Sequence, residues 1–165
     1  MSVAVDVRDL IGHPGSSRAV RVAEPVPGLE TAMARIPEER SVDAALLLES
    51  VVEGILASGP LESVMALVCS RCLKPFERSF RVEVSELFVR GAGPEDDEYP
   101  LLEGEIDIEP MIRDAVLTEM PFAPLCRPDC LGLCPRCGGD RNLPECDHDD
   151  YKQAESDNQQ AWKES

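Results

Sequence analysis

Eight side chains of this sequence have the chemical types and the spacing of metal ligands. Zn²⁺ is usually held by four cysteine or histidine groups arranged as a tetrahedron, so eight donors would fill two closed sites. We therefore expect zinc as the cofactor, bound as one or two ions. The eight candidate ligands are Cys69, Cys72, Cys126, Cys130, Cys134, Cys137, Cys146 and His148.

Two of the cysteine pairs have the two-residue gap that lets two thiolates converge on one ion. Cys134 and Cys137 are followed by two glycines, which relieve the left-handed turn that such a pair requires. Cys69 and Cys72 have the same gap but no glycine after them. The later pair is therefore the more specific metal signal.

The sequence leaves three partitions of these ligands open. In the first, one site takes Cys69, Cys72, Cys126 and Cys130, and the other takes Cys134, Cys137, Cys146 and His148. In the second, the two CxxC pairs share one ion, and in the third Cys126, Cys130, Cys134 and Cys137 form a site by themselves. We favour the first, because it would clamp the C-terminal segment onto the sheet.

Other roles for these cysteines fit less well. A cysteine can be a small buried apolar residue, and four thiolates can hold an iron–sulfur cluster. A CxxC pair can also cycle between dithiol and disulfide, but such pairs usually open a helix after a strand, and neither pair does so here. The charged residues near the N-terminus do not suit a signal peptide, so we expect a cytoplasmic, reducing location without disulfides.

The charge of the chain bears on its partners. The formal net charge is −16, and residues 91–165 carry 19 Asp and Glu against 6 Lys and Arg. Nucleic acid repels such a chain at long range, so an RNA contact must be local, and a basic protein is the easier electrostatic match. The candidate RNA-binding residues are Arg71, Lys74, Arg78, Arg81 and Phe76. The simpler interpretation of this stretch is a solvated strand face with phenylalanines in the core.

The elements that must position the ligands are mostly strands. Aromatic residues make up only 4% of the chain, so Val, Leu, Ile and Ala must build the core, as in a small β-rich fold. Apolar alternation predicts short strands at 3–7 and 20–22, two or three antiparallel strands in 41–72 with turns at Gly54 and Gly59-Pro60, a strand at 78–89 and an edge strand at 105–108. No apolar run is long enough for a membrane span.

One helix is predicted, over residues 109–120. Asp107 is the expected N-cap, Pro110 lies in the first turn and Pro121 ends the helix. The face that should pack on the sheet carries Ile112, Ala115, Val116 and Glu119.

These elements predict an α+β fold. It is mainly an antiparallel β meander or small open barrel with one packed helix and a C-terminal zinc-knuckle segment. Residues 1–125 would form the β-rich core that includes the helix. Residues 126–148 would be the cysteine-rich metal-binding segment, and residues 149–165 a disordered tail.

The order of these motifs resembles the YceD family, the large ribosomal RNA subunit accumulation proteins of bacteria and plastids. The likeness rests on Cys69-x2-Cys72-Leu73-x-Pro75-Phe76, on Ile106-Asp107-Ile108-Glu109-Pro110, and on Cys126-x3-Cys130-x-Gly132-Leu133-Cys134-x2-Cys137-Gly138. It implies a role in producing or stabilising large-subunit (23S) ribosomal RNA, with that RNA or its precursor as partner. Family genes commonly lie beside one for a small, basic large-subunit ribosomal protein.

Three classes of function are considered, of which two are kept. The first is a non-catalytic ribosome-biogenesis factor, an assembly factor stabilised by zinc. The second is an acidic chaperone for a basic large-subunit ribosomal protein, which would dock on residues 95–109 without touching RNA. An enzyme is not expected, because a catalytic metal needs an open coordination position, usually beside a carboxylate or histidine base, and the chain has two histidines and enough cysteines to close every site.

Overall fold

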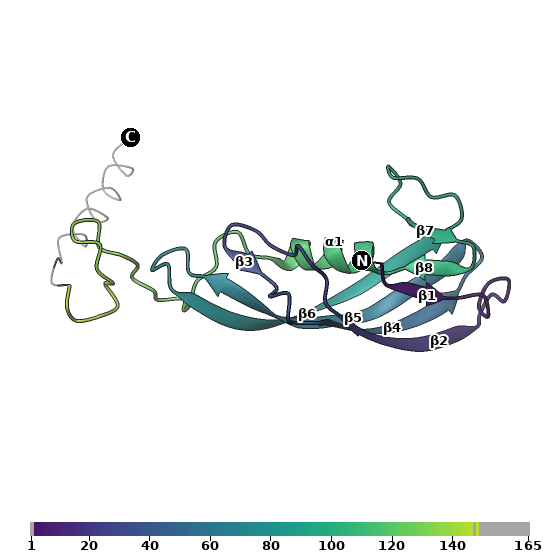
Figure 1. The fold of residues 1–165 in the computed structure, drawn as a ribbon, viewed down its shortest axis with the longest axis horizontal. Coiled ribbons are helices and arrows are strands. Elements are labelled where there is room, and N and C mark those ends of the chain that lie inside the picture. Colours follow the sequence, from purple (N-terminus) through teal and green to yellow (C-terminus); the bar gives the residue numbers. More distant parts are fainter. Residues whose placement is uncertain (1, 147, 149–165) are drawn as a thin grey trace, which may run out of the picture.

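The computed structural model describes residues 2–146 and residue 148, and it shows a curled half-barrel of strands with one helix packed against it (Figure 1). The predicted fold class is confirmed. The elements are β1 (Ala4–Asp6), β2 (Ser17–Glu24), β3 (Ala34–Arg35), β4 (Val42–Ser50), β5 (Gly54–Val68), β6 (Pro75–Val89), β7 (Tyr99–Leu102), β8 (Glu105–Asp107) and α1 (Glu109–Glu119). The tail predicted at 149–165 lies outside the described residues.

The strands follow the order β1-β8-β7-β6-β5-β4-β2, and the short β3 pairs with β5. Strands β2, β4, β5 and β6 are antiparallel neighbours, which is the expected meander, whereas β6 and β7 are parallel. The prediction of an edge strand at 105–108 is wrong. β8 lies between β1 and β7 because the N-terminal strand returns to pair with it, placing Ala4 opposite Asp107.

Strand β5 runs straight through Gly59-Pro60, where the sequence predicted a turn, so residues 42–68 form two strands. Gly59 has a φ of +144°, and a Cβ there would lie 2.2 Å from the carbonyl oxygen of Ala45 on β4. The glycine therefore permits close approach of two backbones, and Pro60 has no N–H to give to the ladder. The β4–β5 register is the same on both sides of this point.

Alternation along the strands builds the core. In β4 the inward side chains Val42, Ala44, Leu46 and Leu48 are at most 2% exposed, and their neighbours in sequence are more exposed. Helix α1 lies against this inner face and adds Met111, Ile112 and Val116 to the same buried cluster (Figure 1). None of the helices in the described part of the chain has the length and apolar character that a membrane span requires.

Helix α1 confirms the predicted element but corrects its cap and its packed face. Ile108 is the N-cap residue, and the Asp107 carboxylate instead accepts hydrogen bonds from the backbone N–H groups of Glu109, at 3.1 Å, and Val3, at 2.9 Å. Asp107 thus links β8, the helix start and the N-terminus. Glu119, expected on the packed face, is exposed, and Met111 is buried there instead.

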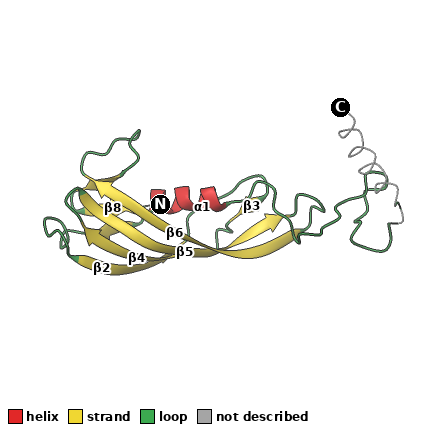
Figure 2. Cartoon of the chain, turned by 180° about the vertical axis from the view of Figure 1, so that it is seen from behind, coloured by secondary structure: helices red, strands yellow, loops and turns green. Residues whose placement is uncertain are grey.

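Figure 2 shows the chain after α1 running beyond the end of the sheet, where the cysteine-rich segment lies. At that end β5 and β6 are joined by the turn of residues 69–74. The candidate ligands therefore gather at one end of the molecule, away from the core.

Candidate metal centre

The turn between β5 and β6 contributes the first two thiols. Its residues are closed by hydrogen bonds from the Cys69 N–H to the Lys74 carbonyl and from the Leu73 N–H to the Cys69 carbonyl, both 2.9 Å. Leu73 adopts a left-handed conformation with a φ of 61°, in the place where the later pair has a glycine. The missing glycine is therefore tolerated, and Cys69 and Cys72 point to the same side.

The chain after α1 brings the next two thiols to this turn. Sulfur atoms of Cys69 and Cys130 are 3.8 Å apart, as are those of Cys72 and Cys126. All four lie within 4.8 Å of one another. We call Cys69, Cys72, Cys126 and Cys130 the sheet-end site. Three of its thiols are buried, with Cys69 0% exposed, Cys130 1% and Cys72 4%.

Backbone and arginine contacts dock this segment independently of any ion. The Ser70 N–H donates to the Pro124 carbonyl at 2.8 Å. Arg71 donates to the Cys130 carbonyl at 2.9 Å, and Arg78 on β6 donates to the Leu125 carbonyl at 3.0 Å. Two arginine side chains thus bind backbone carbonyl groups of the incoming loop, which is the segment that follows α1.

The second group of ligands belongs to a small hairpin. The Cys134 N–H donates to the Gly139 carbonyl at 2.7 Å, and the Gly138 N–H donates back to the Cys134 carbonyl at 2.8 Å. Gly138 has the left-handed φ of 71° that the sequence predicted for this turn.

We call Cys134, Cys137, Cys146 and His148 the C-terminal site. The Cys134 and Cys146 sulfurs each lie 3.7 Å from the Nδ1 atom of His148, and the Cys137 and Cys146 sulfurs are 3.7 Å apart. Cys134 is buried, whereas Cys137 and His148 are exposed. This site is therefore the more open of the two.

Both groups have the dimensions of a tetrahedral zinc site. Four sulfur atoms about 2.3 Å from a central Zn²⁺ would be about 3.8 Å from one another, which matches the separations found here. A disulfide would bring two sulfurs to about 2.05 Å, and all seven cysteines are free. The grouping is that of the first partition. His13, the remaining histidine, is exposed and belongs to neither site.

The thiols within the two sites differ in their pKa values. The backbone N–H of Cys72 lowers the pKa of Cys69 to about 6, and the N–H of Cys137 lowers that of Cys134 to about 6. Burial, together with the neighbouring thiols, raises the pKa of Cys126 to about 12. Clustered thiols that cannot all ionise beside one another are the arrangement that a dication relieves.

Sequence reasoning missed two residues that join the sites. Asn142 donates from its amide to the Cys130 sulfur at 3.4 Å, and Asp140 forms an ion pair with Lys74 at 2.6 Å. That pair lowers the pKa of Asp140 to about 2. The only sequence signal was two polar residues soon after a CxxC-Gly-Gly motif, and their partners are distant in the chain.

The five candidate RNA-binding residues all have partners within the protein. Arg71 and Arg78 bind backbone carbonyls, Lys74 pairs with Asp140, and Arg81 pairs with Glu62 and Glu83. Phe76 is half-buried, and the Arg78 guanidinium lies over its ring, 5.5 Å from the centroid. These contacts give each side chain a structural role.

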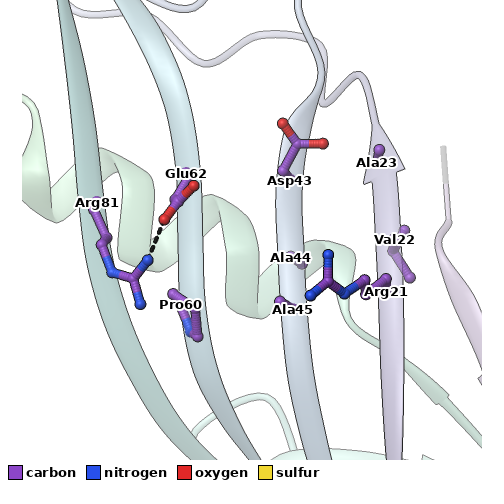
Figure 3. Close-up of a pocket in the computed structure, with 9 residues that line it drawn as sticks. All are labelled: Arg21, Val22, Ala23, Asp43, Ala44, Ala45, Pro60, Glu62 and Arg81. Carbon is purple, nitrogen blue, oxygen red and sulfur yellow. Dashed lines mark hydrogen bonds and ion pairs between the residues drawn. The ribbon is translucent and has the colours of Figure 1, made fainter.

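A pocket of about 630 Å³ lies on the β2, β4, β5 and β6 strands (Figure 3). Figure 3 shows Arg81 and its ion-pair partner Glu62 on one side of the pocket, and Arg21 on the opposite side. The residues lining it include no cysteine, histidine, serine or threonine. This pocket therefore offers no nucleophile of those types and no soft metal ligand.

Comparison with known proteins decides the family. Residues 57–163 match the family described as large ribosomal RNA subunit accumulation protein YceD. This chain belongs to the YceD family. The matched range contains both candidate metal sites, and the description of YceD implies a role in accumulation of large-subunit ribosomal RNA.

Relatives of this YceD chain occur in mycobacteria. Uncharacterized proteins of Mycobacterium bovis and Mycobacterium tuberculosis are each 36% identical over 145 residues, which is 82% of this chain and 69% of the relative. An uncharacterized protein of Mycobacterium leprae is 34% identical over 149 residues, covering 82% of this chain and 66% of the relative. No solved structure gives a significant match.

Proposed function

We propose that this protein is a non-catalytic ribosome-biogenesis factor that supports accumulation of 23S ribosomal RNA in the cytoplasm and is stabilised by two zinc ions. The observation that carries the proposal is the pair of four-ligand groups with tetrahedral dimensions in a chain of the YceD family. Residues 1–125 would act as the folded core, and residues 126–148 as the segment that the metal fixes.

Zinc in such closed sites supplies folding energy and no reaction. The sheet-end site would hold one ion between the β5–β6 turn and the loop after α1. The C-terminal site would hold another between the small hairpin and His148. Together they would fix a segment that buries little apolar surface, since Leu131 is 55% exposed and Leu143 45%. Metal binding would supply the folding energy that apolar burial does not.

Restoring the function in depleted cells tests this proposal. Cells that lack the protein should show a lowered ratio of large-subunit to small-subunit ribosomal RNA, and the intact chain should restore it. A Cys69→Ser/Cys72→Ser chain should restore it poorly, whereas Ser70→Ala, in the same turn, should restore it fully. An unchanged RNA ratio in the depleted cells would overturn the role in accumulation.

A chaperone for a basic large-subunit ribosomal protein is the second candidate. The observation that favours it is the exposed acidic run Glu95–Glu98, in a loop that projects from the sheet between β6 and β7 (Figure 1). The internal partners of the five basic candidates favour it too. Capture of the protein with and without nuclease separates the two: a partner that survives nuclease supports the chaperone, and one lost with the RNA supports the RNA-bound factor.

A further inference from the structure

The loop of residues 138–145 belongs to both metal sites. It begins after Cys137 and ends before Cys146, two ligands of the C-terminal site, and in its middle it contacts the sheet-end site. The contact is made by Asn142, whose side-chain amide N–H lies 3.4 Å from the sulfur of Cys130.

Asn142 also binds the chain on both sides of Cys130. Its side-chain oxygen accepts a hydrogen bond from the Leu131 N–H at 2.9 Å and another from the Arg127 guanidinium at 2.7 Å. One amide group therefore holds a ligand sulfur and the backbone that carries it. Its donor and acceptor ends have different tasks, because only the N–H end can stabilise a thiolate.

Asn142 is held in turn by its own loop. Its backbone N–H and its side-chain N–H both donate to one carboxylate oxygen of Asp140, at 2.9 and 2.7 Å. The other oxygen of Asp140 pairs with Lys74 in the β5–β6 turn at 2.6 Å. The Arg141 N–H donates to the Gly132 carbonyl at 2.9 Å, so the loop is laid along the segment that follows Cys130.

An ion in the C-terminal site fixes both ends of this loop. A loop whose ends are already joined has less conformational entropy to lose when its middle is ordered. The ordered loop presents the Asn142 N–H to the Cys130 thiolate, and such donors to a metal ligand contribute about 10–100-fold to metal affinity. Given the proposed metal binding, we infer that the two sites form one cooperative centre, with Asn142 as the positioning residue that transmits occupancy of one site to the other.

Cooperativity of this kind is reciprocal. The factor by which an ion in the C-terminal site raises the affinity of the sheet-end site must equal the factor in the other direction. Loss of either ion therefore weakens the binding of the second by that same factor without abolishing it.

The test titrates the full chain with Co²⁺, whose visible spectrum differs between four sulfur ligands and three sulfurs with one nitrogen, followed by competition with Zn²⁺. Cys137→Ser/Cys146→Ser should lower the affinity of the sheet-end site by about 10–100-fold. Asn142→Ala should lower it similarly although all eight ligands remain. Glu145→Gln, an exposed change in the same loop, is the matched control and should leave it unchanged.

The Asn142→Asp variant distinguishes two effects, loss of the hydrogen bond to the Cys130 thiolate and loss of the loop structure that Asn142 supports. The aspartate keeps an acceptor for Leu131 and Arg127 but sets a carboxylate beside the Cys130 sulfur, so it should bind metal more weakly than Asn142→Ala. Equal affinity of the sheet-end site in the intact chain and in Asn142→Ala would overturn the coupling. A chain that binds no Co²⁺ or Zn²⁺ would instead overturn the metal sites themselves.

Discussion

The guanidinium of Arg71 donates a hydrogen bond to the backbone carbonyl of Cys130 at 2.9 Å, although 59 positions separate the two residues. Arg71 lies between Cys69 and Cys72, and its own carbonyl accepts the Leu133 N–H at 3.2 Å. One residue of the β5–β6 turn therefore contacts the last ligand of the sheet-end site and the chain just after it. An ion in the sheet-end site would join the same two segments that these hydrogen bonds dock.

Arg71→Met and Arg78→Met should loosen the sheet-end site. Each removes a charge-assisted hydrogen bond to a carbonyl of the incoming loop, which we expect to cost about 1 kcal/mol at these exposed positions. Chelator should then extract the metal faster than from the intact chain. Arg81→Met, which removes only ion pairs on the strand face, is the control, and an equal extraction rate in all four proteins would contradict the docking role.

The same variants test whether these arginines contact RNA directly. If Arg71 and Arg78 act through docking, RNA captured with the protein should fall in their variants in proportion to the metal lost. Arg81→Met should then keep both metal and RNA. RNA lost from Arg81→Met with full metal content would show instead that the strand contacts RNA directly.

A structural feature could be predicted from the sequence when the residues that cause it are neighbours in the chain. The helix at 109–119 and the left-handed Gly138 follow from neighbouring residues, and both were predicted. Gly59 was interpreted as a turn because nothing near it shows that β4 approaches it closely. The roles of Asp107 and Asn142 depend on partners that are not their sequence neighbours, Val3 at 104 positions and Cys130 at 12 positions, and no local pattern reveals these contacts.

Gly59→Ala should destabilise the sheet. Its Cβ would lie 2.2 Å from the Ala45 carbonyl oxygen, at a φ that side chains rarely adopt, so we expect a loss of about 2–4 kcal/mol in the free energy of unfolding. Denaturant titration of the metal-bound chain measures it. Gly12→Ala shares the positive φ but has open space around it, and it should cost only about 1 kcal/mol. Similar losses from both would contradict the close approach.

Metal affinity should rise with pH. The pKa of Cys69 and of Cys134 is about 6, so both sulfurs are largely thiolate at pH 7, whereas that of Cys126 is about 12 and its proton must leave when the ion binds. Below about pH 6 protons also compete for Cys69 and Cys134, and affinity should fall more steeply. Chelator competition between pH 5.5 and 8, with proton release followed in weak buffer, measures this, and an affinity independent of pH would exclude thiolate ligation.

The central claim is that two closed metal sites fix the C-terminal segment to the end of the sheet. Native mass spectrometry of the intact chain, purified without chelator, tests it most directly. Two zinc ions per chain are predicted, falling to one in Cys137→Ser/Cys146→Ser, whose remaining ion would occupy the sheet-end site. An intact chain that carries no metal, also after zinc is added under reducing conditions, would contradict the account.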